Sequence, residues 1–521
     1  MPVRLKKFLL VLAVIGLFVT VFSLSFSRAI RAGSNHDEHQ FIASAELWAG
    51  QGLLPYRDYA YFHLPNLVFV YGLVFRLTEY KLLAARLLSA LCITGIAGLL
   101  YLFSLHTFKK LSSSQGHLVG AGSVLLFTAN PLVAYTGSFA WNHNLALLLA
   151  LLAFMLHWQS ARQARPGRWI FLSGLCLGLA VGTRLSFAST LIPFVAVLYF
   201  YPGQRSAAEI LKRLGVFGAG FIVSLLPVLV LFALAPQNFI FGNFTYARLN
   251  TFYREEAGFF GPPNPMSVVE KGAYFWDFLL PQPGHLLTFV AVLCLGFTPL
   301  LVEAWQRKES LFEPLFLLLT VPFVSLGALL PTPAWYQYYA APLPFAVLAL
   351  VYGMAVLARR HPPGRAWVMA LFLQLVLVAN LYQWGDYRRI SFLLHPEAWR
   401  PIMMHDLGVQ VAELGAGKDV LTLAPIYPLE AGLSIYPEFA TGPFAWRTAP
   451  MLSPGERAAL GLVSSQDLER FLEDRPPGAV LVGFEGELES ALNEYALAHG
   501  YRWVELGVET GVWLSPELTL P

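Results

Sequence analysis

His63-Leu-Pro-Asn-Leu-Val-Phe-Val-Tyr-Gly-Leu-Val-Phe-Arg-Leu-Thr78 is the stretch that decides the fold of this chain. It is apolar, yet it is short, has a proline and an asparagine near its start, and carries an arginine near its end. A helix needs about 20 residues to cross roughly 30 Å of hydrocarbon. Whether this stretch crosses a membrane therefore decides on which side every later loop lies.

The composition of the whole chain predicts a membrane protein. Of its 521 residues, 56% are hydrophobic and only 13% are charged, which is far from the average of soluble proteins. Helices are expected, because lipid offers no hydrogen bonds to an open backbone. Eleven clear apolar runs lie at about 8–28, 82–105, 117–134, 144–160, 169–183, 186–201, 214–235, 286–304, 311–330, 343–358 and 366–384.

Basic residues in short loops predict the orientation. If the stretch 63–78 does not cross the membrane, every basic loop lies on the same side as the basic N-terminus, as the positive-inside rule requires. If it does cross, all later basic loops move to the opposite side and the rule is broken. We therefore predict a re-entrant or interfacial helix at 63–78, a cytoplasmic N-terminus and an outside C-terminus, in an inner or plasma membrane. The net charge of +3 is concentrated in these loops, so no nucleic-acid partner is expected. The basic loops contain Lys109/Lys110, Arg162/Arg165/Arg168, Arg205/Lys212/Arg213, Arg307/Lys308 and Arg359/Arg360/Arg365.

The predicted fold class is an all-α polytopic membrane domain of about 11 transmembrane helices, with juxtamembrane helices on its outer face and a small C-terminal α/β extracytoplasmic domain. Residues 1–384 form the membrane part, which has a first outer loop at 29–81 and a long outer loop at 236–285. Residues 385–521 carry charges throughout, and short apolar runs alternate with helical patterns there. The sequence has no Walker loop, dinucleotide glycine fingerprint or paired Cys/His zinc spacing.

The strongest candidate for chemistry is His36-Asp-Glu-His39, directly after the first span. Two adjacent carboxylates close to lipid are costly to place without a role. The competing interpretation is a solvated helix start with Asp37 as its N-cap. The tetrapeptide alone does not decide between the two.

Further motifs follow in a fixed order. Gly50-Gln-Gly-Leu-Leu-Pro-Tyr-Arg-Asp-Tyr59 and His63-Leu-Pro65 precede the short helix, and Ala85-Arg-Leu-Leu-Ser89 opens the next span. Gly178-Leu-Ala-Val-Gly-Thr-Arg184 and Tyr338-Tyr-Ala-Ala-Pro342 lie later in the membrane part. The order of these motifs, and their predicted position on one side of the membrane, resemble the GT-C superfamily of membrane glycosyltransferases. The resemblance is strongest to the branch of the protein O-mannosyltransferases and the lipid A aminoarabinose transferase.

The resemblance implies an inverting glycosyltransferase that moves a sugar from a polyprenyl-phosphate donor to a lipid, polysaccharide or protein acceptor on the outer face. Asp37 matches the position of the general base, with Glu38 beside it, and a carboxylate within reach of an acceptor hydroxyl can take its proton. A phosphate leaving group needs fixed positive charge, for which Arg184 is the first choice. The other candidates for donor binding are His63, Arg57, Asp58, Arg248, Asn142, His143, Tyr338 and Tyr339.

One residue departs from the family pattern. Many relatives carry an acidic residue where this chain has Asn142, so a pair of carboxylates from two outer loops is missing. No cofactor is therefore required by the sequence, and a divalent metal stays an open alternative. Asn142 and His143 can hydrogen-bond a sugar or phosphate, or only their own loop. Arg86 is interpreted as a snorkelling anchor or a ligand. Arg254 lies in a loop long enough to cap a site, or belongs to a salt-bridged surface.

Two other functions are compatible with this many spans. One is a polytopic lipid or saccharide transporter or flippase, and the other is a catalytically inactive GT-C relative. Transporters place ionisable groups or broken helices near the membrane midplane. The spans of this chain are nearly free of Asp, Glu, Lys and Arg at mid-depth, which favours chemistry at the outer surface.

Overall fold

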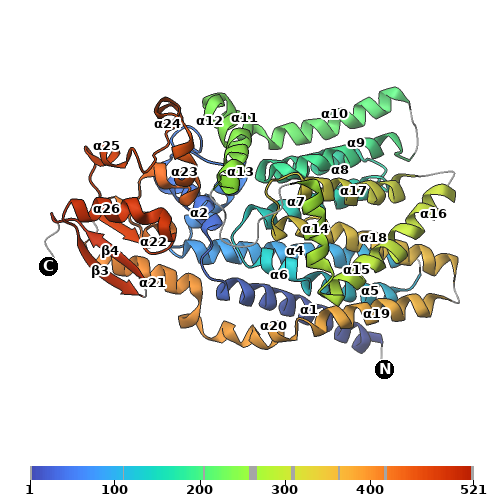
Figure 1. Ribbon diagram of the computed structural model, residues 1–521. Helices are drawn as coiled ribbons and strands as arrows, with labels where there is room; N and C mark the ends of the chain where they lie inside the picture. Colours follow the sequence, from blue (N-terminus) through green and yellow to red (C-terminus); the bar gives the residue numbers. More distant parts are fainter. Residues whose placement is uncertain are drawn as a thin grey trace.

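The computed structural model describes residues 3–109, 111–202, 206–256, 267–306, 311–361, 364–415, 419–507 and 509–517. Helices form a bundle, and the residues from α21 (Arg400–Glu413) onward form a second body at one end of it (Figure 1). We call this second part, residues 400–517, the C-terminal body. Of the predicted basic loops, Lys110, Arg205, Arg307 and Lys308 lie outside the described residues.

In the described part of the chain, six helical segments are long and apolar enough to cross a membrane, and three pairs of helices reach that length together but bend by 67°, 55° and 62°. The six are α1 (Val3–Arg31), α4 (Lys81–Phe108), α7 (Asn142–Ser160), α15 (Pro283–Ala291) continued by η3 (Val292–Phe297) and α16 (Thr298–Gln306), α17 (Phe312–Leu329), and η4 (Tyr336–Ala340) continued by α18 (Leu343–Arg360). The bent pairs are α5 (Ser113–Thr128) with α6 (Pro131–Gly137), α10 (Ala207–Ser224) with α11 (Leu226–Leu234), and α19 (Arg365–Leu381) with α20 (Trp384–Arg388) and η6 (Arg389–Leu394).

Shorter apolar helices complete the bundle: α3 (Asn66–Phe75), α8 (Gly167–Thr183), and η1 (Leu185–Thr190) continued by α9 (Leu191–Tyr199). With 10 residues, α3 is about 15 Å long, half of the hydrocarbon thickness. It is therefore too short to cross, as the sequence predicts for 63–78. Each apolar run predicted from the sequence coincides with one helix, one continuous series of helical elements or one bent pair. The six long segments and three bent pairs of the described residues make nine spans, so a total of eleven requires that α8 and the continuous η1–α9 segment also cross.

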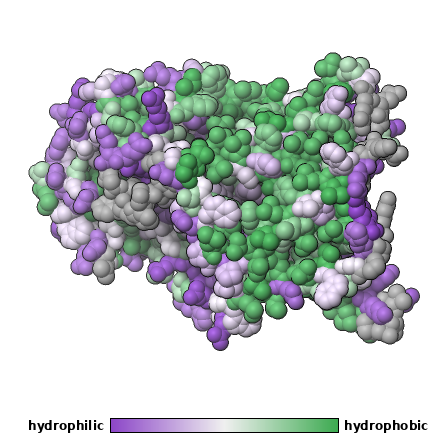
Figure 2. All heavy atoms as spheres, turned by 45° about the vertical axis from the view of Figure 1, so that its right-hand side comes forward, coloured by the Kyte–Doolittle hydropathy of each residue, from purple (hydrophilic) through white to green (hydrophobic). Residues whose placement is uncertain are grey.

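The surface of the bundle is a lipid-facing belt. Figure 2 shows hydrophobic side chains covering the helices, while hydrophilic side chains gather over the C-terminal body. Large apolar residues on this belt are exposed, for example Val230 at 55% and Leu301 at 59%. Contiguous apolar surface of this kind marks contact with lipid rather than water. The chain is a multi-pass membrane protein.

The connections next to the C-terminal body are mostly helical. α2 (His36–Gln51) follows the first span and ends at Gly52, whose φ of 71° is the left-handed conformation that favours glycine. The long loop after α11 contains α12 (Pro236–Ile240), η2 (Phe241–Thr245), α13 (Tyr246–Glu256) and α14 (Val268–Leu279). These elements and the C-terminal body enclose the candidate site described below.

The C-terminal body contains a four-stranded mixed sheet in the order β1-β2-β4-β3. β1 (Val420–Leu421) pairs parallel with β2 (Ala479–Val482), and β4 (Thr510–Leu514) pairs antiparallel with both β2 and β3 (Arg502–Gly507). The short η7 (Pro396–Ala398) leads into α21. The other helices of the body are α22 (Ile426–Glu430), η8 (Pro437–Phe439), α23 (Pro443–Thr448), η9 (Ala449–Met451), α24 (Pro454–Leu460), α25 (Leu468–Leu472), η10 (Gly486–Glu489) and α26 (Ser490–Ala498).

The C-terminal body shares one hydrophobic core with the first outer loop. A single buried cluster contains Phe41 and Tyr71 from that loop together with Ile426 and Leu481 from the body. Buried Glu430 adds a polar attachment, because its carboxylate accepts hydrogen bonds from the backbone N–H groups of the first two residues of α4, at 3.2 and 2.5 Å. A carboxylate at a helix N-terminus satisfies free donors and the positive end of the helix dipole. The body is thus fixed directly to the start of a membrane helix.

Candidate active site

The start of α2 presents Asp37. The helix N-cap is Asn35, whose side-chain oxygen accepts the Asp37 backbone N–H at 2.9 Å. The interpretation of Asp37 as N-cap is therefore wrong, because the neighbouring asparagine already performs that task. Among the described residues, the ion-pair partner of the Asp37 carboxylate is the His36 ring, at 3.6 Å between Nε2 and Oδ1. The side chain is 30% exposed, so its oxygens are open to a substrate hydroxyl.

Glu38 is fully buried and points elsewhere. Its carboxylate receives two hydrogen bonds from the Arg86 guanidinium, at 2.9 and 2.6 Å, and a third from the Ala140 backbone N–H at 2.8 Å. Arg86 also donates to the backbone carbonyls of Ala29, Ala32 and Gly33 at the end of α1. The geometry gives Glu38 a structural task, since an occupied carboxylate with 0% exposure cannot take a proton from a substrate. The fully buried Arg86 is likewise neither a snorkelling anchor nor a ligand.

Arg184 stands at the end of α8, where the chain leaves the helix. Its Nη1 donates to the Asn142 side-chain oxygen at 2.9 Å, and its guanidinium lies 4.9 Å from the centre of the Tyr338 ring. The Asn142 amide donates in turn to the Thr183 carbonyl at 3.4 Å. Asn142 thus holds Arg184 without neutralising its charge.

Two histidines lie beside Arg184. His63 stacks on Phe41 at 5.1 Å, and burial, assisted by the charge of Arg184, lowers the pKa of His63 to about 3. The imidazole is therefore neutral at pH 7 and can donate or accept a hydrogen bond. His143, at the start of α7, stacks on Tyr338 with 5.8 Å between ring centres.

Close packing of two helices brings His63 near Arg184. Asn66 opens α3 and donates through Nδ2 to the Leu179 carbonyl of α8 at 3.3 Å. A Cβ on Gly182 would lie 2.3 Å from that Asn66 nitrogen. The glycine in the Gly178–Arg184 motif thus permits the first outer loop to approach the end of α8.

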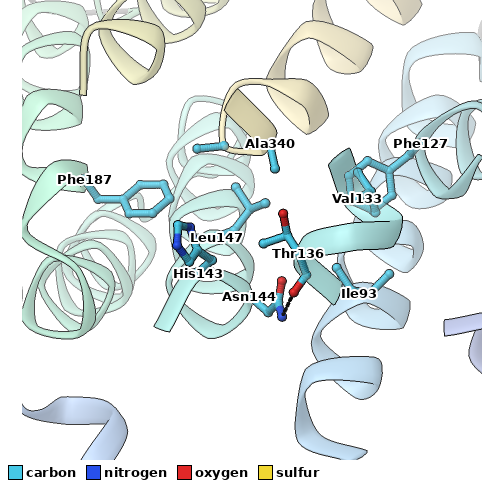
Figure 3. Close-up of a pocket in the computed structure, with 10 residues that line it drawn as sticks. Ile93, Phe127, Val133, Thr136, His143, Asn144, Leu147, Phe187 and Ala340 are labelled. Atoms are coloured by element: carbon cyan, nitrogen blue, oxygen red, sulfur yellow. Dashed lines mark hydrogen bonds between the residues drawn. The ribbon is translucent and has the colours of Figure 1, made fainter. Parts of the chain in front are cut away.

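Two pockets adjoin this group. The first holds about 10 Å³, roughly the room that one water molecule needs, and in Figure 3 the His143 ring lies beside it between Phe187 and Leu147, across from the hydrogen-bonded Asn144 and Thr136. The second also holds about 10 Å³ and is lined by Arg184 and Tyr338. Both are lined by Phe187 and Ala341, so the two pockets lie next to each other. They are small, mostly apolar recesses beside the cationic and hydrogen-bonding side chains of the site.

The structure adds two arginines to this group, of which sequence reasoning missed Arg447. Arg254 of α13 is 6% exposed and lies 4.8 Å from the centre of the Trp335 ring. Burial, assisted by Arg447, lowers the pKa of Arg254 to about 10, while Asp37 acts in the opposite direction. Arg447 of α23 is also 6% exposed and donates to the Asn250 side-chain oxygen at 2.7 Å. The prediction of a surface position for Arg254 is wrong.

Helical phase explains why Arg254 rather than Arg248 faces inward. The buried Tyr246, the Asn250 that binds Arg447, and Arg254 follow an i, i+4, i+8 pattern on one face of α13. Arg248 is six residues before Arg254, which is about 240° around the helix, and it is exposed. The i, i+4, i+8 spacing is the sequence signal that identifies the correct arginine.

Three other predicted residues lie away from this group. Arg57 and Asp58 pair with each other at 2.7 Å, and Asp58 accepts the Leu54 backbone N–H at 2.6 Å. The hydrogen bond from Arg57 is the main cause that lowers the pKa of Asp58. Tyr339 donates to the Lys271 carbonyl at 3.1 Å within a separate aromatic cluster. The polar groups of Arg57, Asp58 and Tyr339 are thus engaged with their own loops rather than with Asp37.

In the described ranges, no three His, Cys, Asp or Glu side chains converge in a way that could hold a metal ion. The Asn142 side-chain oxygen accepts a hydrogen bond from Arg184. Arg184 and Arg254 both interact electrostatically with the Asp37 carboxylate.

Glu485 brings the C-terminal body into the site. It follows β2, and its pKa is raised to about 8, first by burial and then by Glu489, with Arg447 opposing and Asp37 adding to the shift. Because a carboxyl with this pKa holds its proton at neutral pH, Glu485 can donate a hydrogen bond to a ligand oxygen.

Glu485 should make stability depend on pH. The folded pKa of about 8 lies above the ordinary value of 4.5, so between these values the folded state holds a proton that the unfolded state has lost. Stability therefore falls as pH rises through this window. We expect Glu485→Gln to reduce the fall in melting temperature between pH 5 and pH 8. Glu494→Gln, which changes an exposed residue of α26, is the control. Equal declines in both variants would contradict the assignment.

Comparison with known proteins gives a likeness in structure alone. No family model matches the sequence, and no curated protein matches it. The solved structure of ArnT from Cupriavidus metallidurans bound to undecaprenyl phosphate superposes with a TM-score of 0.59 at 14% identity, covering 96% of this chain and 98% of that one. Its apo form gives 0.57 with the same identity and coverage. The apo Archaeoglobus fulgidus oligosaccharyltransferase gives 0.51 at 13% identity, covering 90% of this chain and 69% of that one.

Proposed function

We propose that this chain, which has the GT-C fold of these membrane glycosyltransferases, is an inverting glycosyltransferase that takes a sugar from a polyprenyl-phosphate donor. One observation carries the proposal. An aspartate carboxylate with open oxygens lies within electrostatic reach of Arg184, at the end of an apolar helix and beside apolar pockets. A proton acceptor and an anion-binding cation are the two groups that sugar transfer from a lipid phosphate needs.

The reaction exchanges one bond for another at the anomeric carbon. Asp37 takes the proton of the acceptor hydroxyl as its oxygen forms a bond to that carbon. The bond from the carbon to the donor phosphate breaks, and the phosphate leaves with the electron pair. Arg184 stabilises the negative charge that grows on the leaving group. Attack from the face opposite the phosphate inverts the configuration of the sugar.

The supporting contacts favour a phosphate next to Arg184. Asn142 orients the guanidinium without neutralising it, and the neutral His63 can donate a further hydrogen bond. Tyr338, stacked between His143 and Arg184, limits where the phosphate can lie. A similar solved structure, that of ArnT, is bound to undecaprenyl phosphate, which supports a polyprenyl phosphate as the donor carrier here. The sugar and the acceptor are left open.

We expect Arg184→Ala to weaken donor binding by about 10-fold to 100-fold, because the phosphate loses a charge-assisted hydrogen bond in the ground state as well as in the transition state. Binding of undecaprenyl phosphate to the purified protein in detergent measures the effect. Arg168→Ala removes an exposed arginine from the other end of the same helix and is the matched control. Equal affinities in the two variants would place the donor phosphate elsewhere.

The proposed orientation has a cytoplasmic N-terminus and eleven crossings, so that Asp37 and the C-terminal body face outward. It is supported by the short α3 and by the basic residues of the short loops in the sequence. Reporters fused after Gly167 and Arg360 should report cytoplasm, and those fused after Gly137 and Pro521 should report the outside. A cytoplasmic reporter after Pro521 would contradict the orientation.

The function itself is tested by substrate consumption. Purified protein is added to membranes containing polyprenyl-linked sugars, with and without extracts that supply acceptors. A glycosyltransferase removes one lipid-linked sugar only when an acceptor is present, and produces free polyprenyl phosphate. A transporter or flippase leaves the total of every lipid-linked sugar unchanged, and so does an inactive relative.

A further inference from the structure

Arg447 is a buried cation that the mechanism above does not use. It lies on α23 of the C-terminal body with 6% exposure, and it donates a hydrogen bond to Asn250 at 2.7 Å. Its Nε has no hydrogen-bond partner among the described residues. Its acidic neighbour Glu485, with a pKa raised to about 8, holds its proton at neutral pH. The guanidinium lies over the Phe444 ring at 4.6 Å. A buried charge with open donors is costly unless a ligand completes its contacts.

The position of Arg447 relates it to the site. Its charge acts on His36, the residue before Asp37, and on Arg254. His36 also contacts the ring of Phe444, with 5.6 Å between ring centres. Gly442, just before α23, has a positive φ of 59° and passes close to His39, so that a Cβ there would lie 3.3 Å from the histidine Cβ. The loop before α23 therefore packs on α2 next to the catalytic aspartate.

Arg447 and Arg184 belong to different groups around Asp37. The groups that interact electrostatically with Arg184 are Tyr338, Asp37, His63 and His143. Those that interact with Arg447 are His36, Tyr246, Arg254 and Glu485. The two sets are joined at Asp37, which also interacts with Arg254 and Glu485. Arg184 follows α8 and Arg447 lies on α23, so the two cations reach the surroundings of Asp37 from different elements.

We propose that Arg447 binds a second anionic group of the substrates, a phosphoryl group, next to Asp37. The planar guanidinium is suited to two parallel hydrogen bonds with phosphate oxygens, and the positive charge of Arg254 nearby favours an anion further. The inference rests on the proposed function, because it assumes that Arg184 holds the phosphate at the anomeric carbon. The second phosphoryl group is either the outer phosphate of a polyprenyl diphosphate donor or a phosphate on the acceptor.

Binding measurements on the full-length protein in detergent separate the two sources. The probes are undecaprenyl phosphate, undecaprenyl diphosphate, and dodecyl phosphate added to protein already saturated with undecaprenyl phosphate. Each is titrated into the wild type, Arg447→Gln and Arg447→Lys. Arg502→Gln, which changes an exposed arginine of β3, is the matched control. Unchanged binding of undecaprenyl phosphate to Arg447→Gln shows that this variant is folded.

Two results support the proposal. If the donor supplies the group, Arg447→Gln weakens undecaprenyl diphosphate binding by about 10-fold to 100-fold and leaves the monophosphate unaffected. If the acceptor supplies it, both donors bind alike and only dodecyl phosphate loses affinity by this factor. In either case Arg447→Lys, which keeps the charge, retains part of the affinity.

The proposal is overturned if each of the three probes binds Arg447→Gln with the same affinity as it binds the wild type. If Arg447→Gln does not fold, Arg447→Lys takes its place. The proposal is then overturned if Arg447→Lys binds both undecaprenyl diphosphate and dodecyl phosphate with wild-type affinity. Failure of the wild type to bind undecaprenyl phosphate would instead contradict the proposed function.

Discussion

Asp37→Asn is expected to lower turnover by about 10² to 10⁴, the usual contribution of a general base, while donor binding stays near that of the wild type. The amide keeps the shape of the side chain and cannot accept a proton. Because Asn35 caps the helix, the substitution leaves the helix start intact. Single-turnover rates and undecaprenyl phosphate affinity, measured on the same preparation, separate chemistry from binding.

Glu46→Gln is the matched control for this experiment, since it removes another carboxylate from the same helix, α2. The Glu46 carboxylate pairs only weakly with Lys81, at 3.9 Å. Turnover of Glu46→Gln should stay close to that of the wild type. If Asp37→Asn also turns over within about threefold of the wild type, a base that contributes 10² or more does not reside at position 37.

Glu38→Gln should act on folding rather than on chemistry. The substitution leaves the Arg86 cation buried without its carboxylate, and breaking a buried pair by removing one partner costs about 3 to 5 kcal/mol. Against a total stability of about 5 to 15 kcal/mol, this loss is large. We expect a lower melting temperature and a lower yield of protein that elutes as one species in detergent.

The double variant Glu38→Gln, Arg86→Gln tests the cause. It removes both charges, so its loss of stability should be smaller than the sum of the two single losses. A Glu38→Gln protein that melts like the wild type and has lost its turnover would reverse the assignment, and Glu38 would become the candidate base.

Much of the bundle could be predicted from the sequence, because lipid imposes a simple rule on helix length and polarity. Each predicted apolar run coincides with a helix, a continuous run or a bent pair, and the stretch 63–78 contains only the ten-residue α3. Arg184 and Asp37, identified from the family resemblance, lie within electrostatic reach of each other. The order of motifs along the chain therefore predicted a group of residues that meet in space.

The partners of buried charges could not be predicted in this way. The Arg86–Glu38 pair joins residues 48 positions apart, and Arg447 reaches Asn250 across 197 positions. Hydropathy shows that a charge is present in an apolar context, but not which distant group neutralises it. For this reason Glu38 was predicted to be catalytic, and Arg447 received no role.

The attachment of Glu430 to the start of α4 has a consequence for the order of synthesis. The bonded residues, Lys81 and Glu430, are 349 positions apart, so the first outer loop leaves the ribosome long before its partner does. At about 5 to 20 residues per second, the delay is roughly 20 to 70 s. During that time the loop around Asp37 lacks the apolar partners that the C-terminal body provides. A nascent chain thus holds the Asp37 carboxylate in an incomplete setting, and only the finished polypeptide can assemble the whole candidate site.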